Sequence, residues 1–194
     1  MKTAKKLSVI SRLLLLAGAI LLGISAFFPW WGLDLKATMY PEGLSIIVHP
    51  DKLSGEIDIL NTLNHYIGMK EISEEGFPEL QYIPYVIWGL VAFLVLDAIL
   101  GCRKLAYVIC LLFLVGGALG VYDMYHWLHT FGTELDPDAP IYVDPFVPPV
   151  IGQNQLANFT TFSSFRIGFY FLVLSAFSVF VGTWGERLWA KKPS

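Results

Sequence analysis

The sequence predicts an all-α integral membrane protein, a four-helix bundle with an extracytoplasmic cap built from two long loops that contain short β and helical segments. Hydrophobic residues make up 55% of the 194 residues and charged residues only 15%, whereas a soluble domain carries about a quarter charged residues. The apolar residues gather in four uninterrupted blocks, which lack the alternation of barrel strands. Because only helices or closed barrels satisfy their backbone in lipid, we expect a single membrane domain, residues 1–194.

Each apolar block is long enough to cross a bilayer, since about 20 helical residues span a hydrocarbon core of about 30 Å. The predicted spans are residues 13–31, 83–100, 105–122 and 167–184. The basic, leucine-rich N-terminus also fits a cleaved signal peptide. Trp30 and Trp31 favour the uncleaved alternative, because tryptophan is enriched at the interfacial ends of spans.

The distribution of charge predicts the orientation. Basic residues flank the cytoplasmic ends of the spans, whereas every acidic residue except Asp97 and Glu186 lies in the two outer loops, residues 32–82 and 123–166. The positive-inside rule then places both termini in the cytoplasm and both loops in the periplasm of an inner membrane. The lipid bilayer is the expected partner, and the lack of a basic patch argues against nucleic acid.

An ionisable side chain within a membrane span costs free energy, so its presence there indicates a structural or functional role. Arg12 and Asp97 both lie near the predicted cytoplasmic surface, where they are expected to pair across helices. Arg103 is the alternative partner of Asp97. No further acids or histidines continue this group, so we expect a structural role rather than a proton relay.

Small residues within the third span bear on helix packing. Cys110 is expected to pack in the core, since a buried free cysteine behaves as a small hydrophobe. Gly116 and Gly120 have the GxxxG spacing that permits close helix approach. Packing inside the bundle is favoured over dimerisation for this pair.

The first outer loop is predicted to fold. Residues 33–39 and 44–49 are β-compatible, with Pro41–Gly43 as the turn between them. Asp58 is expected to cap a short helix that stops at about Gly68. The prolines and aspartates of the second loop favour extended and turn backbone, and its apolar residues are expected to pack over the first loop.

Histidine and methionine are concentrated on the predicted outer side. All four histidines, and every methionine except Met1, lie in the two outer loops. Thioether sulfur and imidazole nitrogen together suit copper, Cu(I) in particular. The predicted metal ligands are His65, Met69, Met39, His49, Asp123, His126 and His129.

Spacing supports parts of this set. His65 and Met69 are four residues apart, so a helix would turn both toward one side. Met39 and His49 end adjacent strand-like segments and are expected to converge on that face. The alternative is that these side chains only pack or hydrogen-bond. No CxxC, HExxH or MxxM motif is present, and the absence of nucleophile or phosphate-binding motifs predicts that the chain is not an enzyme.

Two stretches carry a resemblance, YPEGLSIIVHPDKLSGEIDILNTLNHYIGM and DPDAPIYVDPFVPPVIGQNQLANFTTFS. They resemble small bacterial four-span proteins that accompany the maturation genes of nitrous oxide reductase, a periplasmic copper enzyme. The resemblance implies copper delivery or enzyme assembly as the setting, and implies functional roles for Asn64, His65, Met69 and Asn158. The span layout and the Trp30–Leu33 start also look like claudin-type proteins, but the outer cysteine pair of that family is missing.

The expected function is therefore an assembly factor whose periplasmic cap binds or transfers copper, with a periplasmic copper protein or a membrane assembly protein as partner. The alternative is a metal-free structural or adapter subunit that docks a partner through its outer loops. The apolar, proline-rich segment from Phe146 to Ile151 favours this alternative. A third class, a lipid- or haem-handling protein, requires a groove between the helices.

Overall fold

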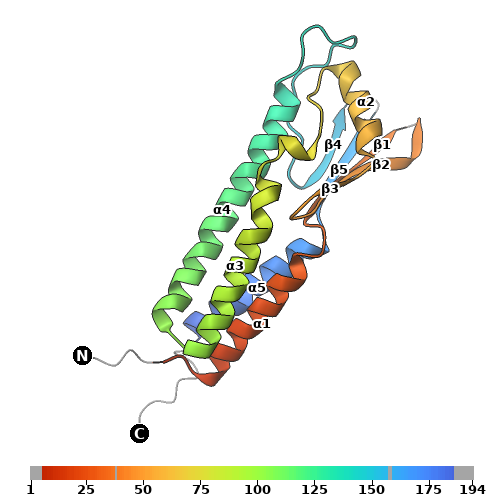
Figure 1. The fold of residues 1–194 in the computed structure, drawn as a ribbon. Coiled ribbons are helices and arrows are strands. Elements are labelled where there is room, and N and C mark those ends of the chain that lie inside the picture. Colours follow the sequence, from red (N-terminus) through yellow and green to blue (C-terminus); the bar gives the residue numbers. More distant parts are fainter. Residues whose placement is uncertain (1–5, 38, 157–158, 186–194) are drawn as a thin grey trace.

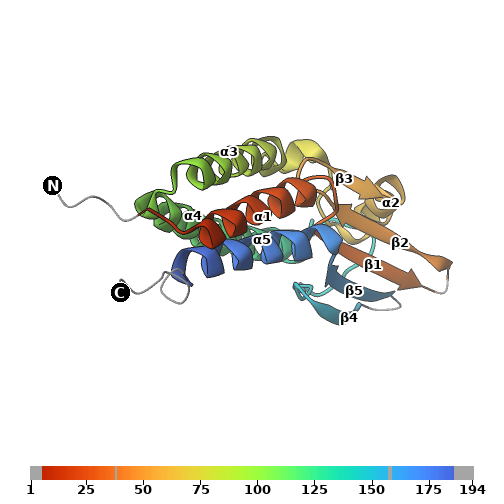
Figure 2. The ribbon, with the colours of Figure 1, turned by 90° about the horizontal axis from the view of Figure 1, so that it is seen from below.

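The computed structural model describes residues 6–37, 39–156 and 159–185. Four apolar helices form an elongated stem, and a five-stranded sheet with one further helix forms a head at one end of it (Figures 1 and 2). The helices are α1 (Val9–Ser25), α2 (Ile57–Ile67), α3 (Glu79–Leu100), α4 (Arg103–Thr133) and α5 (Ile167–Trp184), with a 3-10 turn at Glu74–Gly76. The strands are β1 (Trp31–Ala37), β2 (Tyr40–Val48), β3 (Leu53–Gly55), β4 (Gly152–Leu156) and β5 (Phe159–Phe165).

The predicted all-α fold class is wrong, because the two outer loops combine into an antiparallel sheet of order β3-β2-β1-β5-β4. The central strands β1 and β5 come from different loops, and Trp31 pairs with Phe165 at one end of their shared ladder. Neither loop contains enough strands for this sheet, so it forms only when the stem brings both loops together. The molecule is a mixed α/β protein with a helical stem.

The first hairpin differs from its prediction in the position of the turn. Pro41 and Gly43 lie inside β2, and the chain reverses between Ala37 and Tyr40, which pair with each other. The ladder is irregular beside them, since pairing shifts between Leu35 and Ala37. Pro41, which has no N–H group, and Gly43, whose φ is 85°, are both compatible with an irregular ladder.

The helix predicted in the first loop is confirmed at its C-terminus. α2 ends before Gly68, whose φ of 75° lies in the left-handed region, and the Gly68 and Met69 amides both donate to the Asn64 carbonyl oxygen. The predicted Asp58 cap is wrong, since the helix begins at Ile57. Glu56 precedes it and accepts hydrogen bonds from the Ser45 amide and hydroxyl, which lower the pKa of Glu56.

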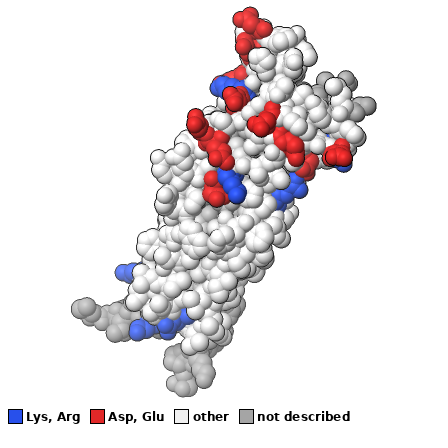
Figure 3. All heavy atoms as spheres, turned by 45° about the vertical axis from the view of Figure 1, so that its right-hand side comes forward, with Lys and Arg blue, Asp and Glu red and all other residues white. Residues whose placement is uncertain are grey.

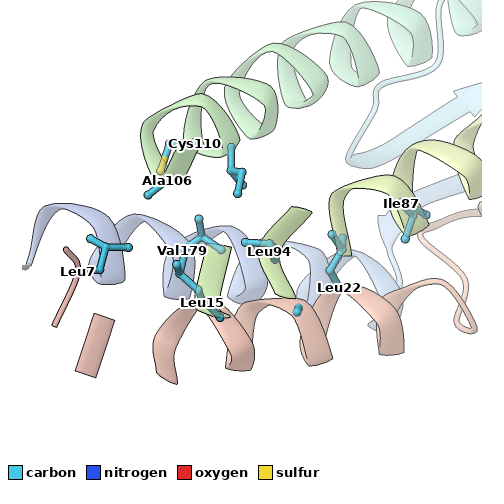
Figure 4. Close-up of a cluster of buried hydrophobic side chains, with 11 residues drawn as sticks. Leu7, Leu15, Leu22, Ile87, Leu94, Ala106, Cys110 and Val179 are labelled. Atoms are coloured by element: carbon cyan, nitrogen blue, oxygen red, sulfur yellow. The ribbon is translucent and has the colours of Figure 1, made fainter. Parts of the chain in front are cut away.

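The core of the stem lies where α1 packs against α3 and α5. Leu15, Leu22, Leu94 and Val179 are fully or almost fully buried there (Figure 4). Close approach of α1 and α5 depends on Gly18, because a Cβ at this position would lie 2.6 Å from Val179 Cγ2. Side-chain hydroxyls add hydrogen bonds across this contact, from Ser175 Oγ to the Gly18 carbonyl at 2.7 Å and from Ser178 Oγ to the Leu14 carbonyl at 2.8 Å.

Arg12 and Asp97 both serve the turn between α3 and α4. The Asp97 carboxylate accepts from the Cys102 amide at 2.8 Å, and the Arg12 guanidinium donates to the carbonyls of Ala98 and Ile99. Each therefore satisfies backbone groups that a helix end leaves unpaired. The predicted Arg12–Asp97 ion pair is not among the ion pairs of the described residues.

Of the two predictions for the third span, the one for Cys110 is confirmed and the one for Gly116 and Gly120 is wrong. Cys110 is 1% exposed and its thiol donates to Thr183 Oγ1, so the predicted core packing is confirmed. Gly116 and Gly120 do not pack inside the bundle, since nothing lies within 4 Å of a Cβ at either position. The predicted tight contact at this pair is wrong.

The stem is apolar enough for a bilayer. Among the described residues, α3, α4 and α5 are long and apolar enough to cross a membrane, and α1 is a shorter apolar helix of 17 residues. Figure 3 shows acidic side chains gathered over the head with a few basic ones among them, basic side chains at the opposite end of the stem, and an uncharged belt between. The protein is therefore a membrane protein by composition and by its surface.

The head is fixed to the stem at several points. The Arg166 amide donates to the Trp30 carbonyl and the Gly168 amide to the Pro29 carbonyl, both at 2.9 Å, which ties the start of α5 to the end of the α1–β1 connection. A second core of buried Leu53, Ile72 and Leu80 lies where the sheet meets the outer end of α3. Phe77 and Phe131 pack against this core.

Candidate functional site

The predicted metal ligands Met39 and His49 lie far apart. They flank opposite ends of β2, whose nine residues extend over about 30 Å at about 3.3 Å per residue. Met39, 82% exposed, lies at the hairpin tip, and His49 lies at the end of the sheet nearest the stem. In an antiparallel hairpin the C-terminal ends of the two strands lie at opposite ends of the hairpin. Met39 and His49 therefore do not converge, as the sequence predicted that they would.

His65 and Met69 lie on either side of the end of α2. His65 is exposed and its ring contacts Tyr66, with 6.2 Å between ring centroids. Met69 is half-buried and follows Gly68, where the chain leaves the helix. The helix ends before Met69, so the predicted placement of His65 and Met69 on one side of a helix is wrong. Asn61, one turn before His65, has partners of its own, since its side-chain amide exchanges two hydrogen bonds with the backbone of Ile72.

Asp123, His126 and His129 all lie on α4, which continues beyond the predicted span. Both histidines are exposed. His126 stacks on Tyr122 of the same helix, and the His129 ring lies tilted against that of Tyr125. Thr133 Oγ1 lies 3.2 Å from His129 Nδ1. Their neighbours are therefore mainly the rings and hydroxyls of their own helix.

No three histidine, cysteine, aspartate or glutamate side chains of the described residues are grouped so that they could hold a metal ion. Asn64, which the resemblance implies has a role, is buried, and its Nδ2 has no hydrogen-bond partner. Asn158 lies outside the described residues. The predicted ligands are thus divided among the hairpin tip, the base of the sheet, the end of α2 and α4.

His49 has the most distinctive electrostatic environment of these candidates. Its imidazole is partly buried at the base of the sheet, and this desolvation lowers the pKa below the usual 6.5. Nearby Lys52 lowers the pKa further, while Asp51 opposes the shift. The neutral imidazole is therefore favoured in the folded head.

The long connection from α4 to β4 is fastened to three other parts of the protein. The Ile141 amide donates to the Tyr66 carbonyl on α2, and the Phe146 amide donates to the Gly132 carbonyl on α4, both at 2.9 Å. The Val150 carbonyl accepts from Trp31 Nε1 on β1 at 2.8 Å. These bonds hold residues 141–151 in one extended path without regular secondary structure.

Close packing at glycine strengthens this attachment. A Cβ at Gly132 would lie 1.7 Å from the Phe146 carbonyl oxygen, and one at Gly68 would lie 2.7 Å from the Asp136 carbonyl oxygen. Only glycine permits the connection to approach α4 and α2 so closely. Lys70 and Glu134 add an ion pair beside it, which lowers the pKa of Glu134.

Residues 141–151 nevertheless direct large apolar side chains outward. Tyr142 is 84% exposed, and Ile141, Val147 and Ile151 are also exposed. Such groups normally turn inward when a connection is held against a protein, and clustered exposed apolar residues mark interaction sites. We refer to residues 141–151 as the docking segment.

A separate depression of about 410 Å³ lies on the sheet. Three of its charged side chains have partners in the protein, since Asp34 binds Arg166, Glu56 binds Ser45, and Lys36 Nζ lies 6.0 Å from the centroid of the Phe162 ring. The residues that line it are Asp34, Leu35, Lys36, Glu42, Gly43, Leu44, Ser45, Glu56 and Phe162. These contacts give the depression a structural role in the head.

A scan against known protein families finds no match to this chain, and a comparison with curated proteins finds no significant relative. The function is therefore argued from the geometry of the head.

Proposed function

We propose that this protein is a membrane-anchored adapter whose head docks a partner protein through the docking segment. The observation that carries the proposal is the combination of fixed backbone and exposed apolar side chains in residues 141–151. A segment that is ordered before binding loses little conformational entropy when a partner arrives. Exposed tyrosine next to isoleucine and valine is the composition of an interface core.

The chemistry of the segment specifies the kind of partner. Asp136, Asp138 and Asp144 lie close to the apolar residues in the sequence and add negative charge. The Tyr142 hydroxyl donates to Asp144 Oδ1 at 3.2 Å. A complementary surface offers an apolar pocket for Tyr142 with basic groups at its rim, since the core of an interface is apolar and its rim polar. A protein in the same compartment as the head fits this description.

The compartment is part of the proposal. We infer an inner-membrane protein with four passes, cytoplasmic termini and a periplasmic head, supported by the basic residues at the stem end far from the head. Cysteine labelling tests the topology. In intact spheroplasts, a membrane-impermeant maleimide should label a Tyr142→Cys variant in a Cys102→Ser background. Cys102 of the natural chain should react only after permeabilisation, and the reverse pattern excludes a periplasmic head.

Site-specific photo-crosslinking tests the docking role. A benzophenone amino acid at Tyr142 or Ile151 should give one defined cross-linked protein in native membranes. The same group at Met39, which is equally exposed but lies at the hairpin tip, should not. Cross-links of equal yield from Met39, or none from the docking segment, contradict the proposal.

Copper handling is the second candidate function. His65 and Met69 support it, because they lie within one turn of each other around the Gly68 cap and neither is held by a side-chain hydrogen bond among those described. Imidazole and thioether are ligands suited to Cu(I). A direct copper titration decides between the candidates.

A further inference from the structure

The sheet of the head has two edges, and they differ in how their backbone groups are occupied. Strand β3 forms the first edge and is three residues long, and its Leu53 amide donates to the Glu74 carboxylate at 3.0 Å. Glu74 thereby occupies a backbone donor that an added strand would otherwise use. Strand β4 forms the second edge and is five residues long. Figure 2 shows it at the border of the sheet, beside β5.

Hydrogen bonds at β4 show which of its backbone groups face outward. Thr161 Oγ1 on β5 donates to the Asn154 carbonyl at 3.3 Å, so this carbonyl faces β5. The Gln155 amide donates to Asn154 Oδ1 at 3.0 Å, which is a local bond outside the ladder. In an antiparallel ladder, successive residues of an edge strand direct their backbone groups alternately toward and away from the neighbouring strand. Gln153 and Gln155 therefore direct their amide and carbonyl groups away from β5.

These outward backbone groups are open to a partner. Gln153 and Gln155 are exposed, and among the described residues no backbone hydrogen bond outside the sheet reaches the Gln153 amide or either carbonyl. A solvent-facing edge usually carries a charge, a proline or a bulge that prevents the addition of another strand. Strand β4 contains no charged residue and no proline, and its pairing with β5 is regular. The β4 edge is therefore a template for one more strand.

The docking segment leads directly into this edge. Its last residue, Ile151, is 61% exposed and is followed by Gly152, the first residue of β4. Gly152 has a φ of 124°, a backbone conformation that glycine adopts without strain. It pairs with Ser163, close to the end of β5 that enters α5. A partner bound at the docking segment therefore lies beside the open backbone of β4.

A second copy of this chain in the same membrane does not fit the edge. Strand β1 follows α1 and β5 returns to α5, so the strands run away from the stem (Figures 1 and 2). Two identical edge strands in a symmetric pair are antiparallel. Such a pair would point the two stems in opposite directions, and one bilayer cannot hold both. The edge therefore fits a strand from a different protein.

We propose that the β4 edge binds an extended segment of the partner protein as a sixth strand of the sheet. This inference rests on the adapter function and specifies how the partner is recognised. Gln153 and Gln155 exchange backbone hydrogen bonds with the segment, and their side-chain amides favour serine, threonine, asparagine or glutamine beside them. In this mode of recognition the main-chain bonds give affinity and side-chain contacts give specificity. Tyr142 and Ile151 supply the apolar contacts next to the added strand.

Binding of the protein that cross-links at Tyr142, measured with the full-length chain in nanodiscs, tests the proposal. Gln153→Pro removes one outward amide and should weaken binding about tenfold, the effect of losing one hydrogen bond in the interface. Gln153→Thr is the matched control, because it changes the side chain but keeps the amide, and it should bind as the wild type does. Proline is tolerated where the amide of an edge strand faces solvent. Amide hydrogen exchange at Asn154 checks that β4 still pairs with β5.

Hydrogen exchange in the unmodified chain provides an independent readout, since the Gln153 amide should exchange more slowly in the complex than in the free protein. If Gln153→Pro binds as Gln153→Thr does while Tyr142→Ala binds weakly, docking stands and strand addition is overturned. An unprotected Gln153 amide in the complex, or a cross-link at Tyr142 between two copies of this chain, also overturns strand addition. No cross-linked product at Tyr142 overturns the adapter function and this inference together.

Discussion

Arg166 Nη2 donates to both carboxylate oxygens of Asp34, at 2.8 and 2.6 Å. The pair joins β1 of the first outer loop to the residue that precedes α5, so it connects segments 132 residues apart. A Cβ at Gly32 would lie 2.6 Å from Arg166 Nε, so this glycine gives the guanidinium its room. The ion pair and the β1–β5 ladder together hold the two loops as one head.

Removing this pair should weaken the head modestly. Both side chains are partly exposed, so we expect Asp34→Asn to lower the free energy of unfolding by about 1 kcal/mol, near the upper range for ion pairs in contact with water. Thermal unfolding in low and high salt measures the effect. A double-mutant cycle with Arg166→Gln should show coupling that shrinks as salt rises, and additive single effects contradict the assigned role.

Gly132 should be intolerant of even one methyl group. In Gly132→Ala the new Cβ collides with the Phe146 carbonyl, and displacement of the docking segment should cost about 2 kcal/mol, as overpacking typically does. Amide hydrogen exchange at Phe146 should accelerate, because its hydrogen bond to Gly132 is lost. Gly89→Ala is the matched control, since nothing lies within 4 Å of that position. Unchanged protection of Phe146 in Gly132→Ala excludes the proposed attachment.

Acidification should destabilise the head through His49. Burial lowers the pKa of this imidazole below 6.5, so the unfolded chain binds a proton that the folded head resists. Stability therefore rises with pH between the lowered folded value and about 6.5, and falls on acidification through that window. His49→Gln should flatten this part of the thermal-stability profile. An unaltered profile in that variant argues against the assignment.

Two double variants test whether His65 and Met69 bind copper. If His65 and Met69 hold Cu(I), replacing both with alanine should weaken binding in a competition titration by at least about tenfold, the effect of about 1.4 kcal/mol. His49→Ala with Met39→Ala should leave the affinity unchanged, because those residues flank opposite ends of β2. If the variant that lacks both His65 and Met69 binds Cu(I) as tightly as the wild type does, these residues are not the copper site.

The sequence predicts local features of this fold better than its long-range pairing. Gly68 stops α2 as expected, because a left-handed cap is determined by the residue itself. Strand β5 was not predicted, because its phenylalanines at 159, 162 and 165 recur every three residues. This spacing matches neither the periodicity of a strand nor that of a helix. This strand is defined by pairing with β1, which lies far away in the chain.

The sequence also predicted some parts of the candidate site and missed others. The proline-rich composition of residues 146–151 indicated an interaction surface, but Ile141 and Tyr142 became part of it only through hydrogen bonds to α2 and α4 that no sequence pattern encodes. The metal prediction treated Met39 and His49 as neighbours from their place at strand ends. Their separation follows from the antiparallel direction of β1 and β2, a property of the folded hairpin.

The most direct test of the adapter role is the affinity of the cross-linked partner for the full-length protein in nanodiscs. We predict that Tyr142→Ala weakens binding by at least about thirtyfold, as expected for a tyrosine at the centre of an interface. Met39→Ala should bind as the wild type does, because Met39 is equally exposed but lies outside the docking segment. Equal affinity of the wild type and the Tyr142→Ala variant would contradict the account.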